Sequence, residues 1–239
     1  MAKFEKVNLL NYPIFFMTKE TKCPYLGNKS EKRLVTDLSN NPFLFDELSL
    51  SGFRRIENWM YRPSCTSCTE CKSYRVNVKN FILTKSLKRI KKNNLEISTL
   101  LKNNLASEEY YDLFSSYQQK RHTGSSMSNM TFDDFKSMIE TSPINTQLCE
   151  FRNKEKKLIG LMLFDHQKDG LSAVYSFYDV KFEKSGLGNF MILELIELAK
   201  KLTLDYVYLG YYIKNAPRMN YKLKFKEGEL YSDGKWTKT

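Results

Sequence analysis

The chain has 239 residues, of which 41% are hydrophobic and 27% are charged; this composition supports a buried core and excludes general disorder. Lys and Arg total 38 against 27 Asp and Glu, and the net charge of +11 predicts a polyanionic partner, nucleic acid ahead of a membrane surface. The longest apolar run, 158–164, is far shorter than the ~20 residues of a membrane span, and residues 1–6 hold no signal-peptide stretch. We therefore expect a cytoplasmic protein without a membrane segment.

The first part of the chain is predicted to contain two strands and a basic helix. Phe53–Pro63, rich in Arg and aromatic residues, is expected to form one strand, and Ser73–Val78 a second. Ser86–Asn94 is expected to form the helix. The polar stretch Asn103–Ser107 marks a boundary, which divides the chain into an N-terminal subdomain, 1–104, and a C-terminal subdomain, 105–239.

Five cysteines without a signal peptide indicate reduced thiols rather than a disulfide scaffold. Three follow the metal-ligand spacing Cys65-x-x-Cys68-x-x-Cys71, and Cys23 is the candidate for the fourth ligand of a tetrahedral site. These four residues are equally consistent with plain structural thiols. A structural zinc ion, an iron–sulfur cluster and a metal-free cluster therefore all stay open. Cys149 stands alone in an apolar context and is expected in the core.

Two helices are predicted after the boundary. The first is expected to begin at Ser107, a plausible cap, and to end near Arg121. The second follows Thr131, which forms a pattern similar to a capping box with Asp134.

The last part of the chain predicts an α/β layer. Leu158–Phe164 and Leu171–Tyr178 are typical of strands, and they are followed by the glycine-rich turn Ser185–Gly188. An amphipathic helix, Asn189–Leu202, and a strand, Tyr206–Tyr211, come next. Because a helix separates the last two strands, this order predicts a parallel crossover.

The glycine-rich turn is a candidate anion site, because it places backbone N–H groups at the positive end of a helix. Glu183-x-x-Gly186-x-Gly188 is similar to the pyrophosphate motif of GNAT acyltransferases, which have Gln or Arg where this chain has Glu183. A P-loop, a dinucleotide fingerprint, a Ser-His-Asp elbow and a kinase signature are all missing from the sequence. With two histidines, a His-rich metal site is excluded.

Seven motifs, each modest alone, stand together in the order found in one family. They are Cys23-Pro24-Tyr25-Leu26; Gly52-Phe53-Arg54-Arg55; Tyr61-Arg62-Pro63 with the three spaced cysteines; Arg121-His122 with Gly124; Gly170 to Asp179; Tyr208-Leu209-Gly210-Tyr211; and Met219 with Tyr221-Lys222 and Phe225. With these motifs the chain closely resembles the aminoacyl-tRNA–protein transferases over nearly its full length, and its bacterial leucyl-transferring branch most of all.

The resemblance implies a GNAT-like acyltransferase fold with a cysteine-containing N-terminal subdomain. It also implies an enzyme that moves leucine from Leu-tRNA to the N-terminal Asp or Glu of proteins, which marks them for N-degron proteolysis. The partners would be aminoacyl-tRNA and those proteins. Because an aminoacyl ester is already activated, no cofactor is required for the chemistry; the enzyme must align the amine, remove a proton and stabilise an oxyanion.

Under this resemblance, four residues are candidates for the catalytic machinery. His122 is the candidate for removing the amine proton, since its ordinary pKa lies in the useful range. Tyr175, Ser176 and Asp179 lie on or just past a predicted strand beside the expected site.

Substrate binding adds two further groups of candidates. An acidic N-terminal residue needs a fixed cation, for which Arg121 is the first candidate, ahead of Arg54 and Arg62. The tRNA is expected to contact basic, glycine and aromatic residues that bind phosphates or the terminal adenosine. These are Lys85, Lys88, Arg89, Lys91, Lys92, Gly186, Gly188, Tyr211, Tyr221 and Lys222.

Three other functions stay open at this stage. The donor amino acid could be arginine, because the sequence identifies no side-chain pocket. An acetyl-CoA-dependent GNAT acetyltransferase would explain the glycine-rich turn but not the basic helix, and a non-catalytic RNA-binding protein would explain the charge alone. The sequence does not determine the oligomeric state.

Overall fold

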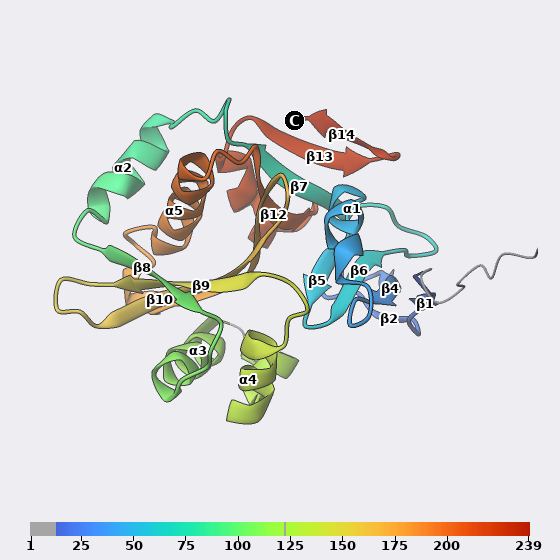
Figure 1. The fold of residues 1–239 in the computed structure, drawn as a ribbon, viewed down its shortest axis with the longest axis horizontal. Coiled ribbons are helices and arrows are strands. Elements are labelled where there is room, and N and C mark those ends of the chain that lie inside the picture. Colours follow the sequence, from blue (N-terminus) through green and yellow to red (C-terminus); the bar gives the residue numbers. More distant parts are fainter. Residues whose placement is uncertain (1–12, 122) are drawn as a thin grey trace, which may run out of the picture.

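The computed structural model describes residues 13–121 and 123–239, so His122, the predicted proton acceptor, lies outside the described residues. The described chain forms a large sheet of eight strands, a smaller sheet of four and a two-stranded ribbon. Figure 1 shows α2 and α5 on one face of the large sheet, α3 and α4 on the opposite face, and the small sheet to one side. The predicted α/β architecture is confirmed.

The helices are α1 (Phe45–Leu50), α2 (Lys85–Asn93), α3 (Glu108–Arg121), α4 (Phe132–Glu140) and α5 (Leu187–Lys201), and the 3-10 segments used below are η4 (Val180–Phe182) and η5 (Pro217–Lys224). The small sheet contains, in spatial order, β1 (Phe15–Met17), β4 (Arg33–Asp37), β6 (Trp59–Pro63) and β5 (Arg54–Ile56), and the ribbon pairs β2 (Thr21–Lys22) with β3 (Ser30–Glu31). The large sheet contains, in spatial order, β14 (Lys235–Lys238), β13 (Gly228–Ser232), β7 (Lys72–Asn77), β12 (Tyr206–Tyr212), β11 (Gly170–Tyr178), β10 (Leu158–His166), β9 (Thr146–Arg152) and β8 (Ser98–Asn103). Among the helices described, none has the combined length and apolarity that crossing a bilayer requires.

The parallel pair of the large sheet is the one that the sequence predicts. β11 runs parallel to β12, and α5 connects them; the other neighbouring strands of this sheet are antiparallel. Gly186 forms the N-cap of α5 with φ +79°, a left-handed conformation that glycine adopts without a steric penalty. The crossover therefore brings the start of α5 close to the end of β11, where a Cβ at Gly188 would approach Tyr178.

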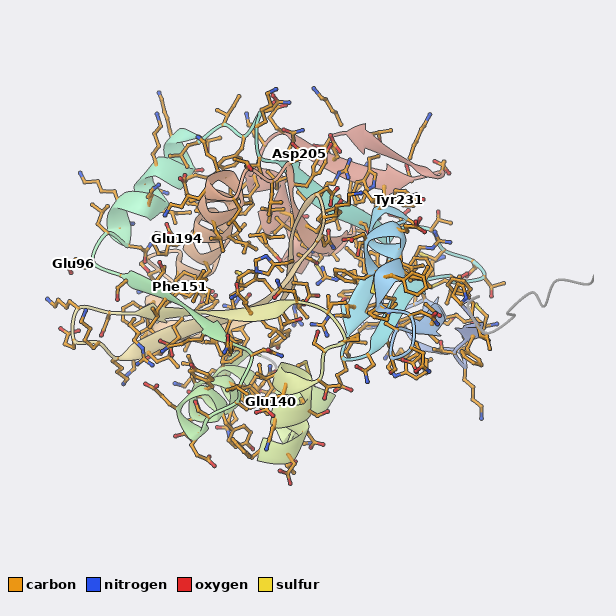
Figure 2. The ribbon with its side chains drawn as sticks, in the orientation of Figure 1. Glu96, Glu140, Phe151, Glu194, Asp205 and Tyr231 are labelled. Carbon is orange, nitrogen blue, oxygen red and sulfur yellow. The ribbon has the colours of Figure 1, made fainter. Side chains whose placement is uncertain are left out.

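The large sheet separates two apolar layers. On one face, the buried side of α5, including Met191 and Leu195, packs on the sheet. Phe151 of β9, labelled in Figure 2, meets Phe190 with ring centroids 6.2 Å apart. On the other face, Phe114 of α3 and Phe135 of α4 lie 5.0 Å apart over the sheet. Burial of these rings and aliphatic chains holds the layers together.

The small sheet differs from the prediction at residues 53–63. The expected single strand is a hairpin, because Glu57 adopts φ +50° and turns the chain between β5 and β6. No glycine marks this turn in the sequence. The hairpin is fixed to the large sheet by Arg55, whose guanidinium donates to both carboxylate oxygens of Asp165 in β10, at 2.8 and 2.7 Å.

Strands from both sides of residue 104 share the large sheet. β7 and β8 precede the predicted subdomain boundary, whereas the other six strands follow it. The division into 1–104 and 105–239 stays a prediction, but the sheet itself is built from both parts. The sequence patterns did not predict β8, β9, β13 or β14, of which β8 is exposed along its whole length.

Candidate active site

The parallel strands β11 and β12 diverge soon after they begin. Residues 170–172 pair with residues 206–208, and no further pairs join these two described strands. Val174 is an extra residue of β11 against β10, and Leu209 is an extra residue of β12 against β7. Such bulges bend strands and redirect their polar groups. We call the diverging segments, 173–178 and 209–212, the fork.

Arg54 of β5 fills the base of the fork. Its Nη2 donates to the carbonyl oxygens of Ala173 at 2.7 Å and Val174 at 3.3 Å. On the other strand, a Cβ at Gly210 would overlap the Arg54 guanidinium, so glycine at this position leaves room for the cation. Arg54 forms no ion pair with any described residue. The fork therefore contains a positive charge that no carboxylate of the described residues neutralises.

Five tyrosines from four parts of the chain lie around this cation and along the fork. Partial burial is the main cause that raises the pKa of each of these phenols, even though Tyr25 and Tyr221 keep 42% and 36% of their surface exposed. It brings the pKa of Tyr175 and Tyr221 to about 12. The positive charge of Arg54 opposes the increase for Tyr25 and Tyr221. The phenols therefore remain protonated near neutral pH and can donate hydrogen bonds. The five are Tyr25, Tyr117, Tyr175, Tyr178 and Tyr221.

Lys222 and Tyr211 lie inside the molecule behind the fork. They are 3% and 7% exposed, rather than on a surface open to RNA as the prediction would require. Lys222 donates to the Tyr211 carbonyl, and the Tyr211 hydroxyl donates to the carbonyls of Tyr61 at 2.9 Å and Gly52 at 3.1 Å. Burial, reinforced by the charge of Arg54, lowers the pKa of Lys222 to about 7. Both residues connect the end of β12 to neighbouring elements.

The four cysteines singled out by their spacing line one cavity of about 40 Å³, which Tyr61 and Tyr211 also line. Burial, with the other three thiols and Glu31, raises the pKa of Cys71 to about 12, so this thiol stays protonated near neutral pH. The donor set is suited to a soft metal, but no three His, Cys, Asp or Glu side chains in the described ranges have a metal-holding arrangement. A metal at Cys23, Cys65, Cys68 and Cys71 stays a prediction.

The basic helix α2 lies against the start of α5. Asn94 at its end donates to the Ser185 carbonyl at 2.9 Å, and a Cβ at Gly186 would approach Ile90 of α2 to 3.0 Å. A Cβ at Gly188 would approach the Tyr178 ring equally closely. The glycine-rich turn is thus tightly packed. Four of the five predicted basic residues are exposed and the fifth, Lys91, is half-buried and 3.5 Å from Glu197; the exposed ones are Lys85, Lys88, Arg89 and Lys92.

The remaining predicted arginines have local partners. Arg121, the first candidate for binding an acidic N-terminus, forms an ion pair with Glu183 at the surface. Arg62 donates to the Ser51 carbonyl at 3.2 Å and stacks 5.0 Å over the Phe53 ring. Arg121 also lies beside Tyr117 and Tyr178, but its charge is paired with Glu183. Of the three cation candidates, Arg54 is therefore the one at the fork without a carboxylate partner among the described residues.

The predicted catalytic residues on and just after β11 lie in different environments. Tyr175 faces α3, where its hydroxyl accepts from Gln118 Nε2 at 2.6 Å. Ser176 points to the opposite face of the strand by alternation. Asp179 caps η4, accepting from the Lys181 N–H at 3.1 Å. Of these three residues, Tyr175 is thus the one that contacts another polar side chain in the apolar layer between α3 and the large sheet.

Gln118 is the residue at this site that the sequence patterns missed. It lies in α3 and is 1% exposed. Its position on the buried face of α3, next to Phe114, is one where the helical pattern predicts an apolar residue. The polar side chain at this position is the feature of the sequence that could have identified Gln118 as a site residue.

Solved structures match parts of this chain at low sequence identity. One match is the crystal structure of FemX, with a TM-score of 0.46, 7% identity, and coverage of 88% of this chain and 82% of that one. Another is the structure of L-PGS from Bacillus licheniformis, with a TM-score of 0.45, 12% identity, and coverage of 59% and 45%.

Family models and curated relatives match most of the sequence of this chain. Residues 21–89 match a family model described as the N terminus of arginine-tRNA-protein transferase, and residues 109–232 match the model of its C terminus. An aspartate/glutamate leucyltransferase from Rhodospirillum rubrum is 40% identical, covering 95% of this chain and 94% of its own. One from Ruegeria pomeroyi is 39% identical, covering 94% and 83%. The two family models and these near full-length relatives show that the chain belongs to the arginine-tRNA-protein transferase family.

Proposed function

We propose that this enzyme transfers leucine from Leu-tRNA to the N-terminal amine of proteins that begin with Asp or Glu. Its relatives carry the name aspartate/glutamate leucyltransferase at 38–40% identity. The observation that carries the acceptor specificity is Arg54, a cation in the fork without a carboxylate partner among the described residues. The product would carry an N-terminal leucine, which in the N-degron pathway marks a protein for proteolysis.

The reaction is an aminolysis of an activated ester. The amine nitrogen forms a bond to the leucyl carbonyl carbon, and the bond to the 3′ ribose oxygen of the tRNA breaks. The proton that the nitrogen loses ends on that oxygen, so atoms and charges balance. The ester supplies the driving force, and the enzyme contributes alignment and stabilisation of the oxyanion. Protonated phenols around the fork are suitable donors for that oxyanion.

Arg54 is suited to recognise an acidic N-terminal side chain. A guanidinium offers five N–H donors in a planar array, and Nη2 alone makes both contacts with the backbone of β11. The backbone contacts hold the cation in place before substrate arrives, which reduces the entropy lost on binding a carboxylate. A Lys- or Asn-started acceptor would leave this charge unpaired, and that mismatch is the basis of discrimination.

The tRNA is proposed to lie along α2 and the start of α5. Lys85, Lys88, Arg89 and Lys92 are exposed on α2, and Asn94 and Ser185 join this helix to the glycine-rich turn. Phosphate contacts from such residues supply affinity without reading sequence. Arg121 neutralises Glu183, the acidic residue closest in sequence to that turn.

The acceptor assignment is tested by measuring leucyl transfer to peptides that differ in one residue, beginning with Asp or with Asn. In Arg54→Gln we expect the Asp-to-Asn ratio of kcat/KM to fall by about 100-fold, equivalent to about 3 kcal/mol. A ratio within one variant is insensitive to the fraction of folded enzyme. Arg121→Gln and Arg62→Gln are the matched controls and should keep the wild-type ratio.

Other outcomes of the same assay contradict specific parts of the proposal. A normal ratio in Arg54→Gln with a reduced ratio in Arg121→Gln would move the carboxylate site to α3. Transfer from Arg-tRNA in place of Leu-tRNA would contradict the proposed donor. The matching family models are described as arginine-tRNA-protein transferase, so this alternative is tested directly. Turnover of acetyl-CoA without any use of aminoacyl-tRNA would overturn the proposed function. His122→Ala tests the predicted base, whose role stays a prediction.

A further inference from the structure

Only one of the two polar atoms of the buried Gln118 amide has a hydrogen-bond partner among the described residues. Its Nε2 donates to the Tyr175 hydroxyl at 2.6 Å, whereas its Oε1 is buried and has no hydrogen-bond partner among the described residues. The side chain is 1% exposed. A buried amide oxygen without a donor is destabilising relative to an apolar side chain of the same shape. Such a group in an otherwise aromatic layer calls for an explanation in terms of function.

The surroundings of Gln118 do not need a polar residue for packing. α3 presents Tyr110 and Phe114 to the same apolar layer, which is completed by Phe135 of α4 and Phe177 of β11. A methionine would fill the volume of Gln118 without polar atoms. Packing alone therefore does not account for glutamine at this position.

The bond to Tyr175 determines what that phenol can do. A hydroxyl has one hydrogen and two lone pairs, and the Tyr175 oxygen uses a lone pair to accept from Gln118. Its hydrogen therefore stays available for another acceptor. Burial raises the pKa of Tyr175 to about 12, so the hydrogen is present at neutral pH. Tyr175 follows the bulge residue Val174, whose carbonyl Arg54 contacts, so this donor lies within the fork, one residue from the Arg54 contact.

Gln118 and Tyr175 thus present one unused acceptor and one unused donor, side by side and linked by a hydrogen bond. We propose that Gln118 Oε1 accepts an N–H of the attacking α-amine, while the Tyr175 O–H donates to the oxygen of the leucyl ester carbonyl. This inference rests on the proposed function and identifies Gln118 as a further residue of the same site. The pair matches the tetrahedral intermediate of aminolysis, which has N–H groups and an oxyanion on one carbon.

The step keeps its atoms and charges in balance. The nitrogen lone pair forms the new C–N bond, and the carbonyl π electrons move to the oxygen that Tyr175 contacts. Collapse of the intermediate returns those electrons and expels the 3′ ribose oxygen, which receives the proton lost by nitrogen. Gln118 accepts a hydrogen bond without taking the proton, because an amide oxygen is too weak a base.

The test compares Gln118→Met, Tyr175→Phe and the double variant in leucyl transfer to an Asp-started peptide. We expect each single variant to lower kcat by about 10- to 100-fold, the range for one lost oxyanion or orienting contact, with KM changed less than threefold. Because the two groups act as a unit, the double variant should be at most threefold slower than the worse single variant. Gln119→Met, in the same helix but exposed, is the matched control and should keep wild-type kinetics.

Thermal unfolding of the same proteins separates a functional role from a structural one. Removing an unsatisfied polar group from the core should leave the Tm of Gln118→Met unchanged or raised while kcat falls. A lower Tm with unchanged kcat in the folded fraction would overturn the inference, as would independent, multiplicative effects of the two single changes. If the wild-type chain transfers no leucine, the proposed function fails; if it does and Gln118→Met matches it, this inference alone fails.

Discussion

Neighbouring arginines of β5 have opposite roles because successive side chains of a strand point to opposite sides. Arg55 is 5% exposed and pairs with Asp165, which also accepts from Thr146 Oγ1 at 2.7 Å. Arg54 instead contacts backbone carbonyls of the fork. One charge therefore fixes the small sheet to the large one, and the adjacent charge stays available for a ligand.

The buried pair gives a stability prediction at the residue scale. Asp165→Ala leaves the Arg55 guanidinium buried without a counter-charge, so we expect the free energy of unfolding to fall by about 3–5 kcal/mol. The matched control is Glu183→Ala, which breaks the exposed pair with Arg121 and should cost about 0–1 kcal/mol. Urea denaturation of the three proteins measures both values. Equal losses in the two variants would contradict the assigned role of Arg55.

At the scale of elements, α2 combines an anchored face with a charged one. Thr84 caps the helix by accepting from the Leu87 N–H at 3.4 Å, and Leu87 is fully buried. Asn94 connects the other end of the helix to the turn before α5. These contacts fix the position of α2 beside α5, so its exposed basic side chains project from a rigid element.

The charge on this face predicts the salt dependence of tRNA binding. Lys88→Ala/Arg89→Ala removes two exposed cations, and if each contacts a phosphate, the log–log salt slope should become shallower by about 1.4–1.8. The control Lys154→Ala/Lys157→Ala removes two exposed lysines from the β9–β10 turn and should leave the slope unchanged. Fluorescence anisotropy of labelled tRNA over a range of salt concentrations gives both slopes. A similar change in both pairs would indicate that net charge, rather than α2, determines binding.

For the whole molecule, Lys222 links stability to pH. It lies in η5 and donates to the Tyr211 carbonyl, with Met219 Sδ at 3.5 Å. Its pKa is lowered from 10.5 to about 7, so the native state releases a proton that the unfolded chain keeps up to about pH 10.5. The unfolded state therefore binds more protons between these values, and this residue's contribution to unfolding free energy rises with pH across that window.

Lys222→Met tests this linkage. Removing the buried cation should raise the unfolding free energy most at pH 7, and the advantage over wild type should shrink toward pH 10 by up to about 1.4 kcal/mol per pH unit. Lys224→Met, exposed in the same segment, should show no pH-dependent difference. Chemical denaturation at a series of pH values measures the effect. A constant difference between Lys222→Met and wild type would mean that Lys222 keeps its ordinary pKa in the fold.

Local patterns determined much of the architecture before any tertiary contact was known. The capping box at Thr131 and Asp134, the apolar stripe of α5 and the parallel crossover all follow from residues close together in sequence. The spacing of the cysteines likewise predicted their grouping, and the four thiols share one cavity. The ordered motifs identified the family, and with it the reaction, without reference to geometry.

Contacts between distant residues decided the site. Arg54 lies 119 residues before Ala173, and Gln118 lies 57 before Tyr175, so no local periodicity brings either pair together. The edge strand β8 was missed for the same reason, since its pairing with β9, beyond α3 and α4 in the sequence, defines it. The hairpin at Glu57 is local and was missed because a residue other than glycine adopts the positive φ of its turn. Which arginine stays unpaired depends on where Asp165 and Glu183 end up in three dimensions, and that is why the structure favoured Arg54 over Arg121.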